Sequence, residues 1–213
     1  LLRHWAIARK NNENDKNALE IVMTSLTRMA RGGIFDHIGG GFFRYTTDRQ
    51  WQIPYFEKVL YDNAQLLKIF AEALRLGPDP LFQDAIEDTI AWLMRDMREP
   101  NGGFYASQDA LLIHSTDSDI GKHYLWRREE VKKHLTQQEY LLIETLYGLD
   151  KPANLNSHWN LHRRDSYRSV VERLSLQSDE ADTLLKSAKS KLFSARELRN
   201  GPNSDKTNLT AWN

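Results

Sequence analysis

The strongest constraint on the fold is a helical repeat of apolar residues in five segments that are separated by turns rich in Gly, Pro or Asn. In each segment apolar residues recur every three or four positions, which places them on one face of a helix. The segments are residues 15–31, 56–76, 79–100, 136–148 and 178–195. Because these helices do not alternate with long strands, the sequence predicts an all-α fold.

Several of the predicted helix ends carry start or stop residues. Thr136 and Glu139 have the spacing of a capping box. Asp79, followed by Pro80, suits an N-cap and first turn, and Ser178 is the predicted cap of the last helix. The glycine pair at 32–33 predicts a left-handed stop for the first helix.

Strand-like residues occur only in short runs beside turn residues. These runs are residues 42–46, 50–53, 104–106 and 123–126. Their lengths predict hairpins within loops and no sheet.

A weak internal repeat links two glycine turns. Gly-Gly-Ile-Phe at 32–35 and Gly-Gly-Phe-Tyr at 102–105 each follow a predicted helix and precede polar residues. Equivalent turns in an array of helical hairpins lie at the same end, so their polar residues would converge on one face. This geometry is typical of a toroid of helical hairpins.

Composition removes several function classes. The 213 residues include 29 Lys or Arg, 29 Asp or Glu and no Cys, so disulfides, thiolate chemistry and a phosphate-backbone partner are not expected. No apolar run has the length of a membrane span, and the N-terminus does not resemble a signal peptide, so we expect a cytoplasmic chain without membrane contacts. Because the chain starts at Leu1 and stops at Asn213, shortly after a helix-start residue at Thr210, we expect it to be part of a longer protein.

Most candidate site residues lie between positions 36 and 63, around the glycines at 39–41. Glycines allow close approach to a ligand, and aromatic rings stack on sugars. The candidates for substrate binding are Asp36, His37, Arg44, Tyr45, Trp51, Lys58, Tyr61, Asn63 and Gln108. Asp62, Glu57 and Asp109 are the candidates for catalysis, because paired carboxylates act as acid and base in sugar chemistry.

Each of these assignments has a structural alternative. The glycines can form a tight turn above aromatic core residues, and Lys58 with Asp62 has the spacing of an intrahelical ion pair. Asp109 can cap a turn, and His37 can bond to backbone. No metal-binding pattern is present, and His158 with His162 is interpreted as a pair of surface residues.

Parts of the sequence resemble the YyaL and spermatogenesis-associated protein 20 family. The resemblance rests on residues 32–63, 102–110, 123–126 and 205–213. It implies a thioredoxin-like domain joined to an (α/α)6 barrel similar to those of N-acylglucosamine 2-epimerase and the six-hairpin glycosidases. Residues 1–213 would then be the first half of that barrel, a single helical domain without the thioredoxin-like domain or the later hairpins.

Two positions depart from the family pattern. Tyr55 stands where relatives usually carry His, and residues 111–114 (Leu-Leu-Ile-His) stand where relatives carry an acidic stretch. Any chemistry of that His or of the acidic stretch would be altered here.

The resulting hypothesis is a carbohydrate-active domain with epimerase- or glycosidase-like acid–base chemistry on a sugar or sugar derivative, without a cofactor. Trp51 and Tyr45 would stack on the sugar, Arg44 and Asn63 would orient hydroxyls, and one of the three carboxylates would act as acid or base. The alternative is a non-catalytic module, in which the same residues form a buried network and the domain contacts a thioredoxin-like domain or a second copy.

Overall fold

The fold is mainly helical, with a few short strands. The computed structural model describes residues 1–11, 15–112 and 120–213. The helices are α1 (Leu2–Lys10), α2 (Lys16–Arg31), α3 (Leu60–Leu74), α4 (Pro80–Trp92), α5 (Arg128–His134), α6 (Gln137–Tyr147), α7 (Tyr167–Arg173) and α8 (Ser178–Glu197). A short π-helical segment, η1 (Leu93–Met97), continues α4. Within the described ranges, no helix has both the length and the apolarity needed to cross a bilayer.

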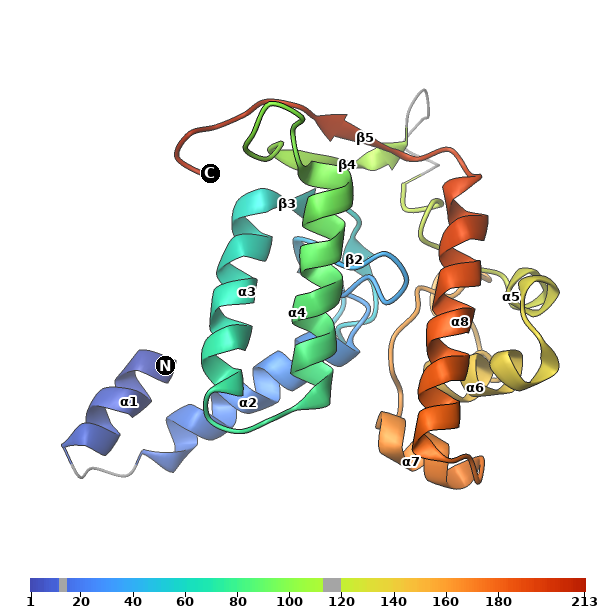
Figure 1. Cartoon of the computed structure of the whole chain (residues 1–213), viewed down its shortest axis with the longest axis horizontal. Helices are drawn as coiled ribbons and strands as arrows, with labels where there is room; N and C mark the ends of the chain where they lie inside the picture. Colours follow the sequence, from blue (N-terminus) through green and yellow to red (C-terminus); the bar gives the residue numbers. More distant parts are fainter. Residues whose placement is uncertain (12–14, 113–119) are drawn as a thin grey trace.

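The first half of the chain is built on α2, α3 and α4. Asp15 caps α2 by accepting a hydrogen bond from the Ala18 amide at 3.0 Å. Helices α3 and α4 run antiparallel beside each other, and α2 passes near their lower ends (Figure 1). Their buried faces enclose a core around the stacked rings of Phe42 and Phe70 and the adjoining Phe82.

The second half has its own core between α6 and α8, around Trp126, Leu146 and Leu192. The predicted capping box of α6 is present, with Thr136 and Glu139 bonded reciprocally. Gly148 then ends the helix in the left-handed conformation, with φ of 68°.

The strands pair more extensively than the sequence predicted. β1 (Tyr45–Thr46) pairs with β2 (Pro54–Tyr55) as a small hairpin. However, β3 (Lys58–Val59), β4 (Ser107–Leu112) and β5 (Pro202–Asp205) form a three-stranded antiparallel sheet, so the prediction of hairpins only was wrong. The cause is non-local pairing, because β5 is a polar segment that follows α8 and has no strand-like pattern of its own.

Three further local predictions need correction. Helix α3 starts at Leu60 and not at residue 56, because the two preceding residues belong to β3. Gly32 ends α2 with an extended backbone, not a left-handed one. It is required for space: a Cβ at Gly32 would lie 2.7 Å from the Trp51 carbonyl oxygen, and a Cβ at Gly33 would lie 2.0 Å from that of Gln52. Finally, α8 is capped at Gln177, without a side-chain bond, and not at Ser178.

Candidate functional site

The centre of the glycine-rich segment is the carboxylate of Asp36, which is buried. Its Oδ1 accepts hydrogen bonds from the amides of Ile38 and Gly39, at 3.1 and 3.0 Å. Lys58 donates from Nζ to Oδ2 at 2.8 Å, and Arg196 donates from Nη1 to both oxygens at 2.8 and 3.0 Å. We call Asp36, Lys58 and Arg196 the buried ionic cluster.

In this cluster the positive charges of Lys58 and Arg196 offset the cost of burying the negative charge of Asp36. Burial alone would raise the pKa of Asp36, but the charges of Arg196 and Lys58 hold it well below its ordinary value. The side chains of Asp36, Lys58 and Arg196 are 5%, 1% and 3% exposed. Because both carboxylate oxygens accept hydrogen bonds from internal donors, the cluster joins β3 and α8 to the loop after α2 and leaves no free acceptor for a ligand.

The aromatic residues around the Lys58 ammonium add to its shielding. Its Nζ lies 5.1 Å from the ring centroids of Phe43 and Tyr124 and 5.3 Å from that of Trp92. It also donates to the Gly40 carbonyl at 2.7 Å. The predicted ion pair between Lys58 and Asp62 is therefore not formed, because the lysine lies in β3 and turns inward.

Asn63 fixes the end of the same glycine loop. Its Oδ1 accepts from the Phe42 amide at 2.7 Å, and its Nδ2 donates to the carbonyls of Phe42 and Val59, each at 3.0 Å. The residue is fully buried. It thus ties the first turn of α3 to the loop that carries Asp36.

His37 and Gln108 are also interior residues. His37 is in hydrogen-bond contact with the Gly32 carbonyl at 3.0 Å through Nε2, and burial lowers its pKa well below the ordinary value. Gln108 accepts a hydrogen bond from the indole of Trp92 at 2.8 Å. Both therefore have structural contacts of the kind that the alternative hypothesis describes.

A second group of the predicted residues lies at the surface, and we call it the acidic–aromatic face. Its members are Arg44, Tyr45, Tyr55, Glu57, Tyr61, Asp62 and Asp109. Arg44 donates to Glu57 at 3.0 Å and to the Tyr61 hydroxyl at 3.5 Å. The rings of Tyr45 and Tyr55 stack with centroids 5.3 Å apart, as expected for residues paired across β1 and β2. Tyr55, the departure from the family pattern, is thus part of this face.

The pairing of β3 with β4 sets the positions of two of the three carboxylates of this face. Lys58 pairs with Gln108 in the antiparallel β3–β4 register, so Glu57 and Asp109 occupy the next pair of opposed positions along the two segments. Their side chains point to the opposite face from the buried Lys58 and Gln108, because strand side chains alternate. Burial and the charges of Glu57 and Asp109 raise the pKa of Tyr55, which agrees with this placement.

Asp62 lies in the first turn of α3, near enough to Arg44 and Glu57 for their charges to act on it. Burial raises its pKa, the positive charge of Arg44 opposes that rise, and the negative charge of Glu57 adds to it. The net shift is upward, which is the direction required of a carboxyl group that donates a proton near neutral pH.

The structure separates other predicted residues from this face. Trp51 lies in the turn between β1 and β2, half-buried against the first core, with φ of 63°. His162 is buried, with 7% of its surface exposed, so its interpretation as a surface residue was wrong. It is buried because the loop 160–163 folds against the end of α2, where the Arg163 amide donates to the Arg31 carbonyl at 2.7 Å. Leu111 and Leu112 end β4, whereas residues 113 and 114 lie outside the described residues.

Sequence reasoning missed Arg196, which completes the buried ionic cluster from the last turns of α8. A signal was present, since Arg196 extends the buried row Ala188 and Leu192 at a spacing of four. A charged residue that continues an apolar helix face indicates a buried partner.

Comparison with known proteins places the chain among one set of relatives. No protein-family model matches the chain. Spermatogenesis-associated protein 20 of Homo sapiens is 32% identical over 240 aligned positions, which cover 100% of this chain and 30% of the relative. The Mus musculus protein of the same name is also 32% identical over the whole chain, and an uncharacterized Caenorhabditis elegans protein is 28% identical over 98% of it. The chain thus spans about 30% of the length of the curated relatives it matches.

Proposed function

The chain belongs to the spermatogenesis-associated protein 20 family, and from this premise we propose that it supplies the acid–base face of a carbohydrate-active domain. The names of the relatives assign no activity, so the proposal rests on the residues of the chain itself. Its substrate class is a sugar or sugar derivative, and its reaction is epimerase- or glycosidase-like proton transfer.

The observation that carries the proposal is the composition of the acidic–aromatic face. Three carboxylates, an arginine and three tyrosines occupy the ends of two short ladders and the first turn of α3. Tyrosine rings supply apolar faces for a sugar ring, and Arg44 supplies donors for hydroxyls. Trp212 extends the aromatic surface, because its ring meets that of Tyr61 edge-on at 4.8 Å.

Roles within this face follow from charge and environment. Asp62 has the raised pKa and is the proposed acid, while Glu57, bonded to Arg44, is the proposed base. Asp109 is the third carboxylate; its Oδ1 also accepts from the Leu111 amide at 3.3 Å, in keeping with a turn-capping role. Trp51 and Asn63 are not assigned to the substrate, because they lie away from this face or in the interior.

We infer in addition that the helical pairs belong to an (α/α)6 toroid, of which this chain is the first part. The antiparallel pair α3 and α4 and the packing of α6 on α8 are the kind of hairpins that such a toroid repeats (Figure 1). The later hairpins and the thioredoxin-like domain would be supplied by other parts of the longer protein.

The second candidate function, a non-catalytic module that supports a thioredoxin-like domain or pairs with a second copy, is favoured by a separate observation. Asp36, His37, Lys58, Asn63 and Gln108 are all buried and bonded internally. These five residues have structural contacts whether the domain is catalytic or not. The two candidate functions therefore differ only in the role of the exposed carboxylates.

A ligand screen by thermal shift tests the carbohydrate proposal. Simple, amino and acidic sugars are added to the wild-type chain and to Asp62→Asn, and a ligand at 100 times its dissociation constant adds about 2.7 kcal/mol to the stability of the folded state. We expect a sugar that stabilises the wild type and has a smaller effect on the variant. If no sugar stabilises the wild type, or if both proteins respond equally, the carbohydrate role of this face is wrong.

A further inference from the structure

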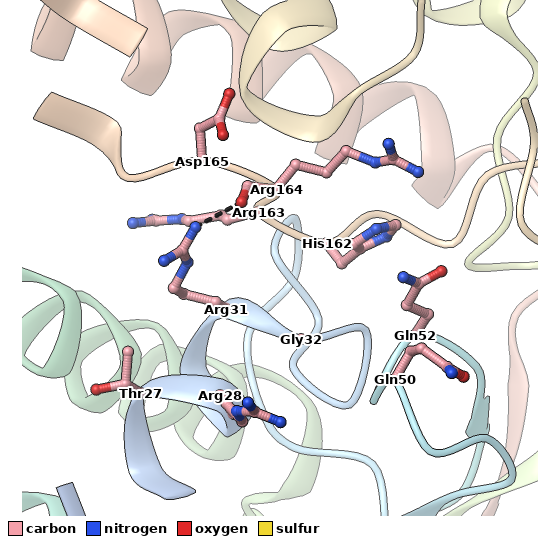
Figure 2. Close-up of a pocket in the computed structure, with 10 residues that line it drawn as sticks. All are labelled: Thr27, Arg28, Arg31, Gly32, Gln50, Gln52, His162, Arg163, Arg164 and Asp165. Carbon is pink, nitrogen blue, oxygen red and sulfur yellow. Dashed lines mark hydrogen bonds between the residues drawn. The ribbon is translucent and has the colours of Figure 1, made fainter. Parts of the chain in front are cut away.

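A polar pocket lies on a different part of the molecule from the acidic–aromatic face. It has a volume of about 610 Å³ and is lined by the end of α2, the turn between β1 and β2, and the loop 162–165. Figure 2 shows Arg28 and Arg31 approaching from α2, Arg164 from the loop, and Gln50 and Gln52 from the hairpin turn. The volume is in the range of sites for small molecules.

The pocket carries an excess of positive charge. In the described part of the chain, no carboxylate forms an ion pair with Arg28, Arg31 or Arg164. The two other charged residues of the lining form ion pairs with residues outside the pocket. Asp165 pairs with Arg173 at 2.8 Å, and Arg163 pairs with Asp84 at 3.1 Å. Three arginines therefore line the pocket without a paired carboxylate, and the guanidinium of Arg31 donates to the Arg164 carbonyl at 2.6 Å.

The C-terminal end of α2 does not cancel this charge. A helix C-terminus carries a partial negative charge of about half a unit. However, the Arg28 carbonyl accepts from the Gly32 amide at 2.8 Å, and the Arg31 carbonyl accepts from the Arg163 amide at 2.7 Å. Asp48 is the other nearby carboxylate, and it is engaged by the amides of Gln50, Gln52 and Ile53.

An unpaired histidine nitrogen provides an independent observation. His162 lines the pocket and is 7% exposed, yet its Nε2 has no hydrogen-bond partner among the described residues. Nδ1 lies 3.2 Å from both the Asn154 amide nitrogen and the Asn160 carbonyl oxygen. Nε2 is a free donor in the tautomer in which Nδ1 accepts from Asn154, whereas it is an acceptor in the tautomer in which Nδ1 donates to Asn160. A buried polar atom without a partner in a pocket wall is a place at which a ligand or a bound water can supply the missing hydrogen bond.

We propose that this pocket binds a phosphate group, either as inorganic phosphate or as the phosphate of a small ester. Arginine has a planar fork of donors that matches phosphate oxygens, and three arginines suit a dianion better than a single carboxylate. The side-chain amides of Gln50 and Gln52 supply further donors on the opposite wall. This site is independent of the proposed sugar chemistry and uses none of its residues.

Isothermal titration calorimetry tests the proposal with two probes, inorganic phosphate and glucose 6-phosphate, at constant ionic strength, with glucose as the neutral control. We expect saturable binding of at least one phosphate probe and none of glucose. Tighter binding of the ester than of inorganic phosphate would identify the ester as the source of the group. The absence of saturable binding of both probes up to on the order of 10 mM would overturn the proposal.

The variant Arg28→Gln/Arg164→Gln locates the site. Both side chains are exposed at the pocket rim, so the substitutions are expected to leave the fold intact, which circular dichroism verifies. We expect affinity for the phosphate probe to fall about tenfold or more, because two charge-assisted contacts are lost. Arg75→Gln, an exposed arginine at the end of α3, is the matched control and should bind as the wild type does. Equal affinity of the double variant and the wild type would contradict the assignment.

Nitrogen NMR of the His162 imidazole gives a readout inside the pocket. Phosphate bound at this site should shift the Nε2 resonance in proportion to the calorimetric occupancy. Binding that leaves this resonance unchanged would place the anion elsewhere and reject the site. Asp62→Asn should retain phosphate binding, which separates a failure of this proposal from a failure of the sugar proposal.

Discussion

Arg196 and Asp36 form a buried ion pair across 160 positions of the sequence, with Nη1 at 2.8 and 3.0 Å from the two carboxylate oxygens. The pair joins the last turns of α8 to the loop that follows α2. Because Lys58 shares the same carboxylate, removal of a single negative charge affects three elements of the fold.

Replacement of Asp36 by Asn should therefore destabilise the chain severely. The substitution leaves Lys58 and Arg196 as buried cations without a counter-charge, and breaking a buried pair in this way costs about 3–5 kcal/mol. Urea unfolding followed by circular dichroism measures the loss. Glu20→Gln, at an exposed position of α2, is the control and should change the stability by less than about 0.5 kcal/mol. A similar small change for Asp36→Asn would show that the cluster is not needed for stability.

Asp62→Asn should leave stability nearly unchanged, in contrast to Asp36→Asn. The Asp62 side chain is half-buried at the surface and makes none of the internal hydrogen bonds that hold Asp36 and Asn63. We expect a change of less than about 0.5 kcal/mol in urea unfolding. A large loss would indicate that Asp62 supports the fold and would favour the non-catalytic function.

Gly40→Ala should destabilise the chain through the backbone. Gly40 has φ of 80°, and an added Cβ would lie 1.9 Å from the Asp88 carbonyl oxygen of α4. The left-handed conformation alone costs a non-glycine residue about 1–2 kcal/mol, and the contact with backbone adds to this cost. The melting temperature and urea midpoint should both fall. Gly77→Ala is the matched control, because nothing lies within 4 Å of its added Cβ; equal effects of the two substitutions would refute the steric argument.

Acidification should start to weaken the fold near pH 6.5, before the carboxylates take up protons. Burial, reinforced by the positive charge of Arg196, lowers the pKa of His123 from 6.5 to about 4. Below about pH 6.5, His123 is therefore protonated in the unfolded chain, whereas in the folded chain it stays neutral until the pH falls to about 4. The free energy of unfolding should fall as the pH drops from about 6.5 to about 4, by at most about 3 kcal/mol from this residue.

Urea unfolding at a series of pH values measures this dependence for wild type and His123→Asn. The variant should show a shallower slope between pH 4 and 6.5, whereas replacement of the exposed His134 should leave the slope as in the wild type. His37, whose pKa is also lowered by burial, contributes in the same direction and keeps part of the slope in the variant. Parallel curves for wild type and His123→Asn would contradict the prediction.

The elements that sequence reasoning predicted well are those whose signals are local. The capping box at Thr136 and Glu139 and the stop at Gly148 bound α6, and both are within the helix itself. The predicted cap of α4 at Asp79 is likewise a contact with a residue two positions away, the Leu81 amide. Such signals depend on neighbours in the sequence, so tertiary packing did not change them.

The features that were missed depend on distant partners. The strand character of Pro202–Asp205 comes from pairing with β4, and its own residues are polar turn formers. For the candidate site, the sequence could not separate the two faces of residues 36–63. Lys58 and Glu57 are adjacent, yet one is buried against Asp36 and the other is bonded to Arg44 at the surface. That division depends on the register of β3 with β4, which no local pattern specifies.

The distance in sequence between Asp36 and Arg196 also affects how the chain reaches its native state during synthesis. The glycine loop is made early, but its carboxylate meets its second cation only after α8 has left the ribosome. At about 5–20 residues per second, the 160-residue separation corresponds to roughly 8–32 seconds of translation. During that interval Asp36 can pair with Lys58 alone. The buried ionic cluster in the first half of the chain is therefore completed only when Arg196 of the second half is available.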